Sequence, residues 1–169
     1  MSTRVWHIAQ LNVGTTVAPL ASPELADFVA ALDGINALAE ASPGFVWRLK
    51  NDSGNATGIR ASDDPNFIVN MSVWESIDAL FAFVYISAHT KVMARRGEWF
   101  SKPDEAYQVL WWVPAGHEPT VDEALARLEH LRRHGSAAHA FTFKARYPAP
   151  GHGGEPVDMK PEPYCVGWA

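Results

Sequence analysis

The chain of 169 residues is poor in cysteine, in long apolar runs and in clustered positive charge. Its single cysteine, Cys165, excludes an intramolecular disulfide framework and a cysteine-rich zinc site. It has neither an apolar stretch of about 18 residues for a membrane span nor the apolar core of a signal peptide, so we expect a cytoplasmic protein without a membrane partner. The net charge of −5, with no basic cluster, argues against nucleic acid as a partner.

Several catalytic and binding motifs are also missing. The segment GHGGE at 151–155 has neither the strand-to-helix context of a dinucleotide-binding loop nor a Walker lysine. No G-x-S-x-G motif is present. His130, His134 and His139 lack an H-E-x-x-H context, and the exposed face of a helix accounts for the first two. We therefore predict no metal site.

Apolar and aromatic residues are abundant. Hydrophobic residues make up 47% of the chain, and seven of the residues are tryptophan. The length suits one domain with a sizeable core. So many tryptophans require either a heavily aromatic core or a ligand pocket. We predict one domain over residues 1–147, followed by a Pro/Gly-rich tail over 148–169.

Residue periodicity predicts the order of helices and strands. Alternating residues predict strands at 4–13, 45–49, 67–74, 107–113 and 140–144, with a polar loop at 50–66. Helical spacing predicts helices at about 23–40, 77–97 and 121–134, the last two capped by Ser76 and Thr120. The order β-α-β-β-α-β, followed by α-β, indicates an α+β fold of the ferredoxin-like, split βαβ type, extended by one helix and one strand.

The first strand predicts two unlike faces of the sheet. His7, Ala9 and Leu11 alternate with Gln10 and Asn12, so the two amides lie opposite the core-packed set. A ferredoxin-like sheet has helices on one face only. We therefore expect a partner's sheet to cover the polar face, which makes a homodimer with two sheets closing a barrel.

Several segments resemble a known superfamily. Residues 67–89, FIVNMSVWESIDALFAFVYISAH, resemble the signature of the dimeric α/β-barrel proteins, in which a strand ends in tryptophan and a serine-capped helix carries a histidine. Together with RVWHIAQLNVG (4–14), SPELADFVAALDGINALAEASPGFVWRL (22–49), GNATGIR (54–60) and LWWVPAGHEPTVDEAL (110–125), they resemble an uncharacterised bacterial family within this antibiotic-biosynthesis-monooxygenase-like superfamily, a domain of unknown function. The resemblance covers residues 4 to about 147 and implies a dimeric α/β barrel.

The superfamily includes cofactor-independent monooxygenases, heme-degrading monooxygenases, chlorite dismutases, aldoxime dehydratases, cyclases and isomerases, and a shared fold does not choose among them. Heme-degrading members resemble this chain in having an asparagine at the end of the first strand, here Asn12. They have a tryptophan where this chain has Phe83, and their heme-ligand histidine lies about one turn beyond His89. These two departures argue against heme degradation.

Amides are the first candidates for a site. The resemblance implies that Asn12 hydrogen-bonds a substrate oxygen or an oxygen derived from O₂; alternatively it bonds backbone at the strand end or lies at the dimer seam. Two inward amides, Gln10 and Asn12, are costly in a dry core unless they are satisfied. Asn70 and Ser72 share a predicted face with Trp74, a polar and aromatic mixture typical of small-molecule pockets. For Trp74 the alternative is simple packing at a strand–helix junction.

His89 follows Tyr85 by four residues, which places the two rings on one side of the predicted helix. Its imidazole suits a general acid, base or ligand, or else it is hydrogen-bonded at the margin of the core. Arg95, Arg96 and Trp99 form either an anion-binding lip with an aromatic lid or a helix end that complements the dipole. The remaining residues predicted to bind substrate are Trp47, Phe83 and Trp112.

The leading hypothesis is a small-molecule enzyme, a cofactor-independent monooxygenase or cyclase acting on an aromatic or polycyclic metabolite. In it, Asn12 holds the developing oxyanion, His89 moves a proton and tryptophans flank the ring. One alternative is a heme protein with His89 as axial ligand. The other is a non-catalytic protein that binds a small hydrophobic or aromatic ligand.

Overall fold

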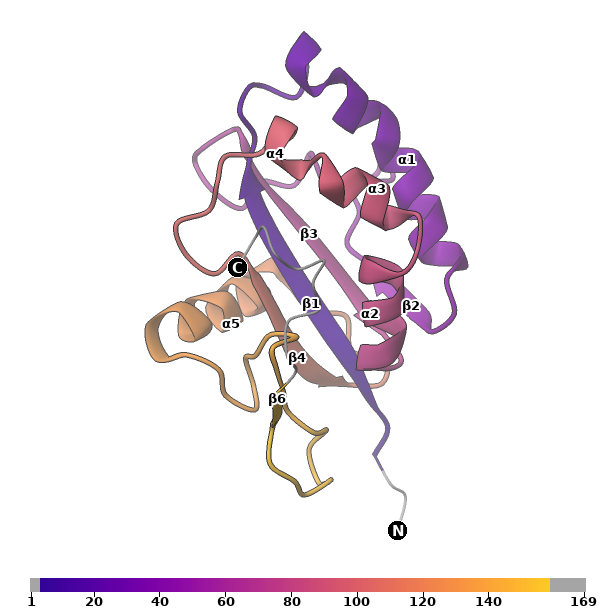
Figure 1. The fold of residues 1–169 in the computed structure, drawn as a ribbon, viewed down its shortest axis with the longest axis vertical. Coiled ribbons are helices and arrows are strands. Elements are labelled where there is room, and N and C mark those ends of the chain that lie inside the picture. Colours follow the sequence, from indigo (N-terminus) through magenta and orange to yellow (C-terminus); the bar gives the residue numbers. More distant parts are fainter. Residues whose placement is uncertain (1–3, 159–169) are drawn as a thin grey trace.

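The computed structural model describes residues 4–158, and their centre is a four-stranded antiparallel sheet (Figure 1). In chain order the elements are β1 (Trp6–Thr15), the short 3-10 helix η1 (Pro23–Leu25), α1 (Ala26–Ala41), β2 (Phe45–Arg48), β3 (Phe67–Trp74), α2 (Ile77–Tyr85), α3 (His89–Ala94), α4 (Arg96–Trp99), β4 (Gln108–Pro114), α5 (Val121–His134), β5 (Ala145–Arg146) and β6 (Val157–Asp158). No helix within 4–158 has the length and apolarity needed to cross a membrane.

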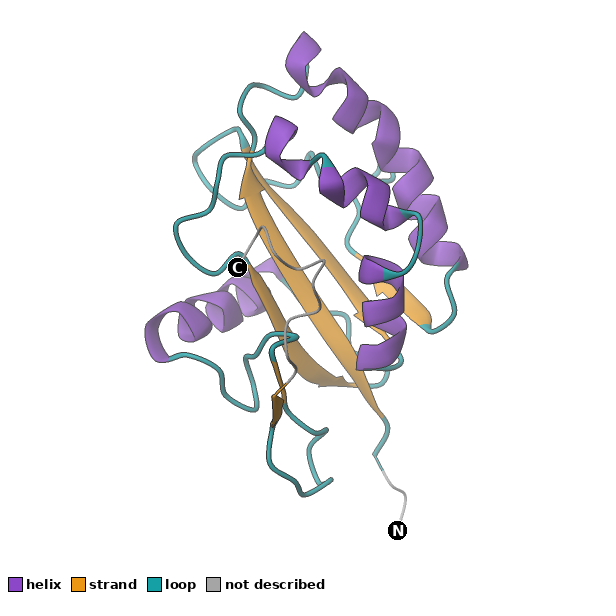
Figure 2. Ribbon diagram, viewed as in Figure 1, coloured by secondary structure: helices purple, strands orange, loops and turns teal. Residues whose placement is uncertain are grey.

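The strand order is β2-β3-β1-β4, which confirms the split βαβ arrangement and the α+β class (Figure 2). The long strand β1 lies between β3 and β4. Its register aligns Gln10 with Ser72 on one side and with Leu110 on the other, and Asn12 with Asn70. The chain thus brings polar residues 60 positions apart onto adjacent points of one face.

Helices cover both faces of this sheet, which corrects the expectation that they lie on one face. On the first face, Ala9, Leu11 and Trp111 pack with Leu128 and other apolar residues of α5. On the second, Ile8, Trp74 and Leu110 pack with α2, while α1 and α3 lie farther along the same side (Figure 1).

The expectation that a partner's sheet covers the polar face is also wrong. Gln10 and Asn12 line a cavity together with residues of α1, α2 and α3, so helices of the same chain cover the amides. The periodicity correctly separated the two faces of β1, but it did not indicate which helix covers which face. The homodimer itself stays a prediction.

The helix predicted over 77–97 is broken into α2, α3 and α4. At the first break, the Ser87 hydroxyl donates to the Phe83 carbonyl and accepts the backbone N–H of His89, 3.1 Å away. Serine side chains that bond nearby backbone in this way compete with the regular helix. The second break lies at Arg95, where the backbone turns before α4 begins at Arg96.

The strand predicted at 140–144 is not a regular strand. Phe141 makes one pair of backbone bonds with Leu110, at 2.7 and 2.9 Å, and its neighbours fold into turns through bridges between Ala137 and Ala140 and between Thr142 and Ala145. The apolar alternation instead reflects burial of Ala140, Phe141 and Phe143 against the core.

The predicted tail begins with structure of its own, because Val157–Asp158 pairs with Ala145–Arg146 as a small antiparallel ladder. The rest of the tail, including Cys165, lies outside the described residues.

Replacement of Leu128 by alanine tests whether α5 is part of the core. The Leu128 side chain is 1% exposed, and its truncation should leave a cavity under α5. We expect the free energy of unfolding to fall by about 2–5 kcal/mol in urea denaturation. The control is Arg133→Ala on the exposed side of α5, with an expected loss below about 1 kcal/mol. Equal, small losses in the two variants would mean that α5 is not packed on the sheet.

Candidate functional site

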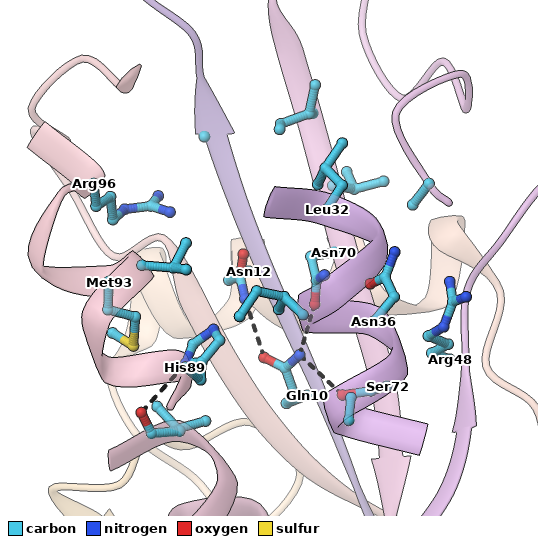
Figure 3. A pocket seen from close by; sticks show the side chains of 18 of the residues that line it. Gln10, Asn12, Leu32, Asn36, Arg48, Asn70, Ser72, His89, Met93 and Arg96 are labelled. Carbon is cyan, nitrogen blue, oxygen red and sulfur yellow. Dashed lines mark hydrogen bonds between the residues drawn. The ribbon is translucent and has the colours of Figure 1, made fainter. Parts of the chain in front are cut away.

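A cavity of about 180 Å³ lies between the polar face of the sheet and helices α1, α2 and α3 (Figure 3). This volume compares with an apolar cavity of about 150 Å³ that accepts benzene in another protein. Its floor is Gln10, Asn12, Asn70 and Ser72 of β1 and β3. Its wall includes apolar side chains of α1, such as Leu32 and Ile35.

The cavity exists because α1 does not close onto the centre of the sheet. Ala39 is the only buried residue of α1; Phe28, Leu32 and Ile35, which form its apolar stripe, are partly exposed and line the cavity. Short polar side chains on β1 and β3 leave room beneath them. The helical stripe in the sequence is therefore the wall of a pocket as well as a packing surface.

A hydrogen-bonded amide cluster forms the floor. The Gln10 Nε2 donates to Asn70 Oδ1 and to Ser72 Oγ, each at 3.1 Å, and Asn12 Nδ2 donates to Gln10 Oε1 at 3.4 Å. Ser72 Oγ also accepts the indole N–H of Trp74 at 2.9 Å. Gln10 is 4% exposed, so these bonds satisfy an amide that is otherwise costly to bury.

This pattern decides which amides can bind a ligand. Gln10 Nε2 donates both of its hydrogens within the cluster. Asn12 Nδ2 donates one of its two hydrogens, and Asn70 Nδ2 donates neither of its hydrogens to a residue within 4–158. Asn70 is exposed at the cavity and Asn12 partly so. Asn12 and Asn70 are thus the donors for a ligand oxygen, and Gln10 positions them.

His89 lies across the cavity from the amides (Figure 3). Its Nδ1 is 3.2 Å from the carbonyl oxygen of Val84, and a carbonyl only accepts, so Nδ1 carries the hydrogen. The neutral ring therefore has its lone pair on Nε2. The break at Ser87 makes this bond possible, because an unbroken helix would use the Val84 carbonyl for its own backbone ladder.

The protonation state of His89 suits a base. Burial lowers the pKa of His89 below its ordinary value of 6.5, and the bond to the Val84 carbonyl offsets only part of this effect. The imidazole is therefore neutral at pH 7. It packs against Phe83, with ring centroids 4.8 Å apart, and Tyr85 lines the same cavity.

Eight of the predicted site residues line the cavity: Gln10, Asn12, Asn70, Ser72, Phe83, Tyr85, His89 and Trp99. The other four, Trp47, Trp74, Arg95 and Trp112, are placed elsewhere. Trp74 is fully buried behind Ser72, and Trp112 donates its indole N–H to the Tyr147 carbonyl at 3.0 Å. Arg95 is exposed and ion-paired with Asp27 and Glu98.

A β-bulge explains the position of Trp47. Phe45 pairs with Trp74, but Trp47 pairs with Val73, because the register of β2 shifts between them. Phe45 therefore packs on the α2 side, and Trp47 packs with the core on the α5 side, away from the cavity. In a regular strand, residues 45 and 47 would share one face.

Arg96 lines the cavity. The sequence placed it with Arg95 at a possible anion-binding lip, but only Arg95 was predicted to bind substrate. Arg95 lies at the break between α3 and α4 and Arg96 begins α4, so helical periodicity could not separate their roles. The absence of acidic partners at the correct spacing from Arg96 was the one available signal.

The cavity is small compared with a heme. Sites for drug-sized ligands usually have about 300–1,000 Å³, and a tetrapyrrole with its side chains is at the large end of that class. The volume of about 180 Å³ is below this range, although His89 has a suitable lone pair. Within residues 4–158, no group of three or more His, Cys, Asp or Glu side chains is arranged to hold a metal ion.

Comparison with solved structures gives distant similarities, among them three at 17% sequence identity. The NE2512 protein of unknown function from Nitrosomonas europaea has a TM-score of 0.42, with 70% of this chain and 97% of that chain covered. Rv0793 from Mycobacterium tuberculosis has 0.45, with 68% and 99% covered. SnoaB, a cofactor-independent oxygenase from Streptomyces nogalater, has 0.42, with 68% and 95% covered. At these values the similarities say nothing about the activity of this chain.

No curated protein matches the chain. A family match, in contrast, spans nearly all of the described residues. Residues 7–155 match the family described as a domain of unknown function, DUF3291, and the chain belongs to this family.

Proposed function

We propose that the protein is a small-molecule enzyme that removes a proton from an aromatic substrate without a cofactor, as the first step of a monooxygenase-type or cyclase-type reaction. The observation that carries the proposal is the pairing of a neutral imidazole base with amide N–H donors across a small, largely apolar cavity. A base and an oxyanion site on opposite sides of a substrate are what the ionisation of a carbon acid requires.

In this reaction His89 Nε2 takes a proton from a carbon next to a substrate carbonyl. The electron pair of the broken C–H bond moves onto the carbonyl oxygen, which becomes an enolate oxygen. The free hydrogens of Asn12 and Asn70 bind that oxygen and stabilise its charge in surroundings of low polarity. The imidazolium left at Nε2 is also bonded through Nδ1 to the Val84 carbonyl, which supports its charge.

The enolate then has two possible fates. With O₂ as co-substrate, its carbon bonds to O₂ and gives a peroxide anion, which takes up the proton from His89 to become a hydroperoxide. Loss of water from the hydroperoxide converts the original CH₂ group to C=O. In the cyclase-type reaction, the same carbon attacks a second carbonyl within the substrate. Both need only the base and the amides. The cavity of about 180 Å³ favours a substrate with one or two rings over a larger polycyclic one.

Hydrogen–deuterium exchange at a carbon acid tests the proton transfer directly. We expect the protein in D₂O to accelerate exchange at the acidic CH₂ of 2-tetralone, measured by NMR. His89→Gln should lower this rate by about 10²–10⁴-fold because the base is lost. Asn12→Ala should lower it by about 10²–10³-fold because an oxyanion donor is lost.

The matched control is His152→Gln, which removes an exposed histidine outside the cavity and should leave the rate unchanged. Binding of 2-tetralone without accelerated exchange would contradict the enzyme and favour the non-catalytic binding protein.

The lowered pKa of His89 gives a pH dependence of known sign. The exchange rate should be constant at pH 7 and above and should fall only when the pH drops below 6.5, as the imidazole takes up its proton. The unfolded chain takes up this proton at higher pH than the folded protein, so the free energy of unfolding should also fall as the pH drops from 6.5 through the folded pKa.

The stability difference between the wild type and His89→Gln, followed by urea denaturation from pH 7.5 to 5, measures this contribution. His152→Gln should keep the wild-type slope. If the free energy of unfolding of His89→Gln changes with pH as steeply as that of the wild type, the imidazole is not buried in the folded protein.

An absorption spectrum tests the exclusion of heme. We expect the purified protein to show no Soret band and to form none on addition of hemin beyond that of His89→Gln, because the cavity is too small. A Soret band that depends on His89 would replace the proposed enzyme with the heme protein.

A further inference from the structure

The charged residues around the cavity differ in sign from the chain as a whole. The full chain carries 19 acidic and 14 basic residues, yet the cavity lining contains Arg48 and Arg96 and no aspartate or glutamate. A site that excludes carboxylates in an acidic protein favours a negatively charged ligand.

The two arginines of the lining differ in their partners. Arg48 Nε lies 2.8 Å from Glu40 Oε1, so its charge is already compensated. No carboxylate of residues 4–158 forms an ion pair with Arg96. The nearby acidic side chains of Asp27 and Glu98 both bind Arg95 instead, at 2.8 and 2.9 Å.

Arg96 is held in place by neutral groups. Its Nη2 donates to the Val13 carbonyl at 3.2 Å, and its guanidinium lies 4.4 Å from the ring centre of Phe100 and 4.8 Å from that of Tyr107. Its Nε is buried without a hydrogen-bond partner. Burial also lowers the pKa of Arg96, which means that its surroundings compensate the charge incompletely.

Gly14 of β1 makes this position possible. A Cβ at residue 14 would lie 2.6 Å from the Phe100 ring and 3.0 Å from Arg96 Nη2. The glycine therefore lets the guanidinium reach the strand that carries Asn12, and Figure 3 shows the side chain extended toward that strand. The arginine, the amides and His89 thus surround one cavity.

We propose that the ligand of this cavity is a small aromatic acid whose carboxylate pairs with Arg96. The remaining N–H groups of Nη1 and Nη2 form the fork that binds a carboxylate, and the apolar wall of α1 accepts the ring. The inference rests on the proposed function, because it names the substrate class of the same cavity. Arg96 anchors the substrate, and Asn12, Asn70 and His89 act on its reacting end.

Binding of two matched probes to the full chain tests the proposal. 2-Naphthoate and 2-naphthamide have nearly the same shape, and only the first is an anion. We expect the wild type to bind 2-naphthoate at least about tenfold more tightly in calorimetric titrations, since a charge-assisted pair adds more than about 1.4 kcal/mol. Arg96→Gln should remove this preference by weakening 2-naphthoate binding while leaving 2-naphthamide binding unchanged.

Arg95→Gln is the matched control, because it removes the same charge from the neighbouring residue outside the cavity and should keep the preference. Arg96→Lys, which keeps the charge but loses the fork, should retain part of it. Should Arg96→Gln fail to fold, the wild-type preference and the Lys variant still decide the question. Equal wild-type affinities for the two probes, or a preference that survives in Arg96→Gln, would overturn the proposal.

The outcomes separate this proposal from the enzymatic one. If exchange of 2-tetralone is accelerated but 2-naphthoate is not preferred, only the proposal of an anionic substrate is overturned, and the proposed enzyme stands. If the preference for 2-naphthoate depends on Arg96 but exchange of 2-tetralone is not accelerated, only the proposal of an enzyme is overturned. If the wild type binds neither naphthalene probe, the proposal that the ligand is an aromatic acid is overturned. If the same sample also fails to accelerate exchange of 2-tetralone, the proposal of an enzyme is overturned as well.

Discussion

The buried amide of Gln10 is the interaction on which the site depends. A primary amide that is 4% exposed must find partners for its donors and its acceptor, and it finds them in Asn70, Ser72 and Asn12. These bonds tie β1 to β3 on the face that α1, α2 and α3 cover. They also orient the remaining amide hydrogens of Asn12 and Asn70 toward the cavity. One constraint of folding thereby produces a polar floor under an apolar wall.

The second constraint is the interruption of the helix that follows β3. Ser87 ends the regular ladder, frees the Val84 carbonyl for His89 and sets the hydrogen on Nδ1. The next interruption separates Arg95, which is exposed, from Arg96, which lines the cavity. Local irregularity thus supplies both the base and the cation, as is common where function competes with regular structure.

The anionic substrate and the enolate chemistry fit one molecule. Arg96 would neutralise the carboxylate, and the amides would receive the charge that develops at the reacting end. The two negative groups would then meet different donors, so they need not compete for one site. The neutral state of His89 fits as well, because a protonated imidazole would have no lone pair with which to begin the reaction.

The sequence by itself determined the order of strands β1 to β4 with the helical segments between and after them, the capping residues Ser76 and Thr120, and the polar face of β1, because periodicity and caps are local properties. It did not show that the helix over 77–97 is broken or that 140–144 is not a regular strand. It also indicated Asn12, Asn70 and His89 as members of one site, through alternation and a resemblance to a known superfamily. Only the tertiary structure decided which helices cover the polar face, since packing of α5 on the opposite face depends on contacts far apart in the chain. It also placed Trp47 on the α5 side of the sheet at a β-bulge, because a shift of one residue in strand register reverses the face that a side chain occupies. The break between α3 and α4, which interrupts helical periodicity, placed Arg96 at the cavity.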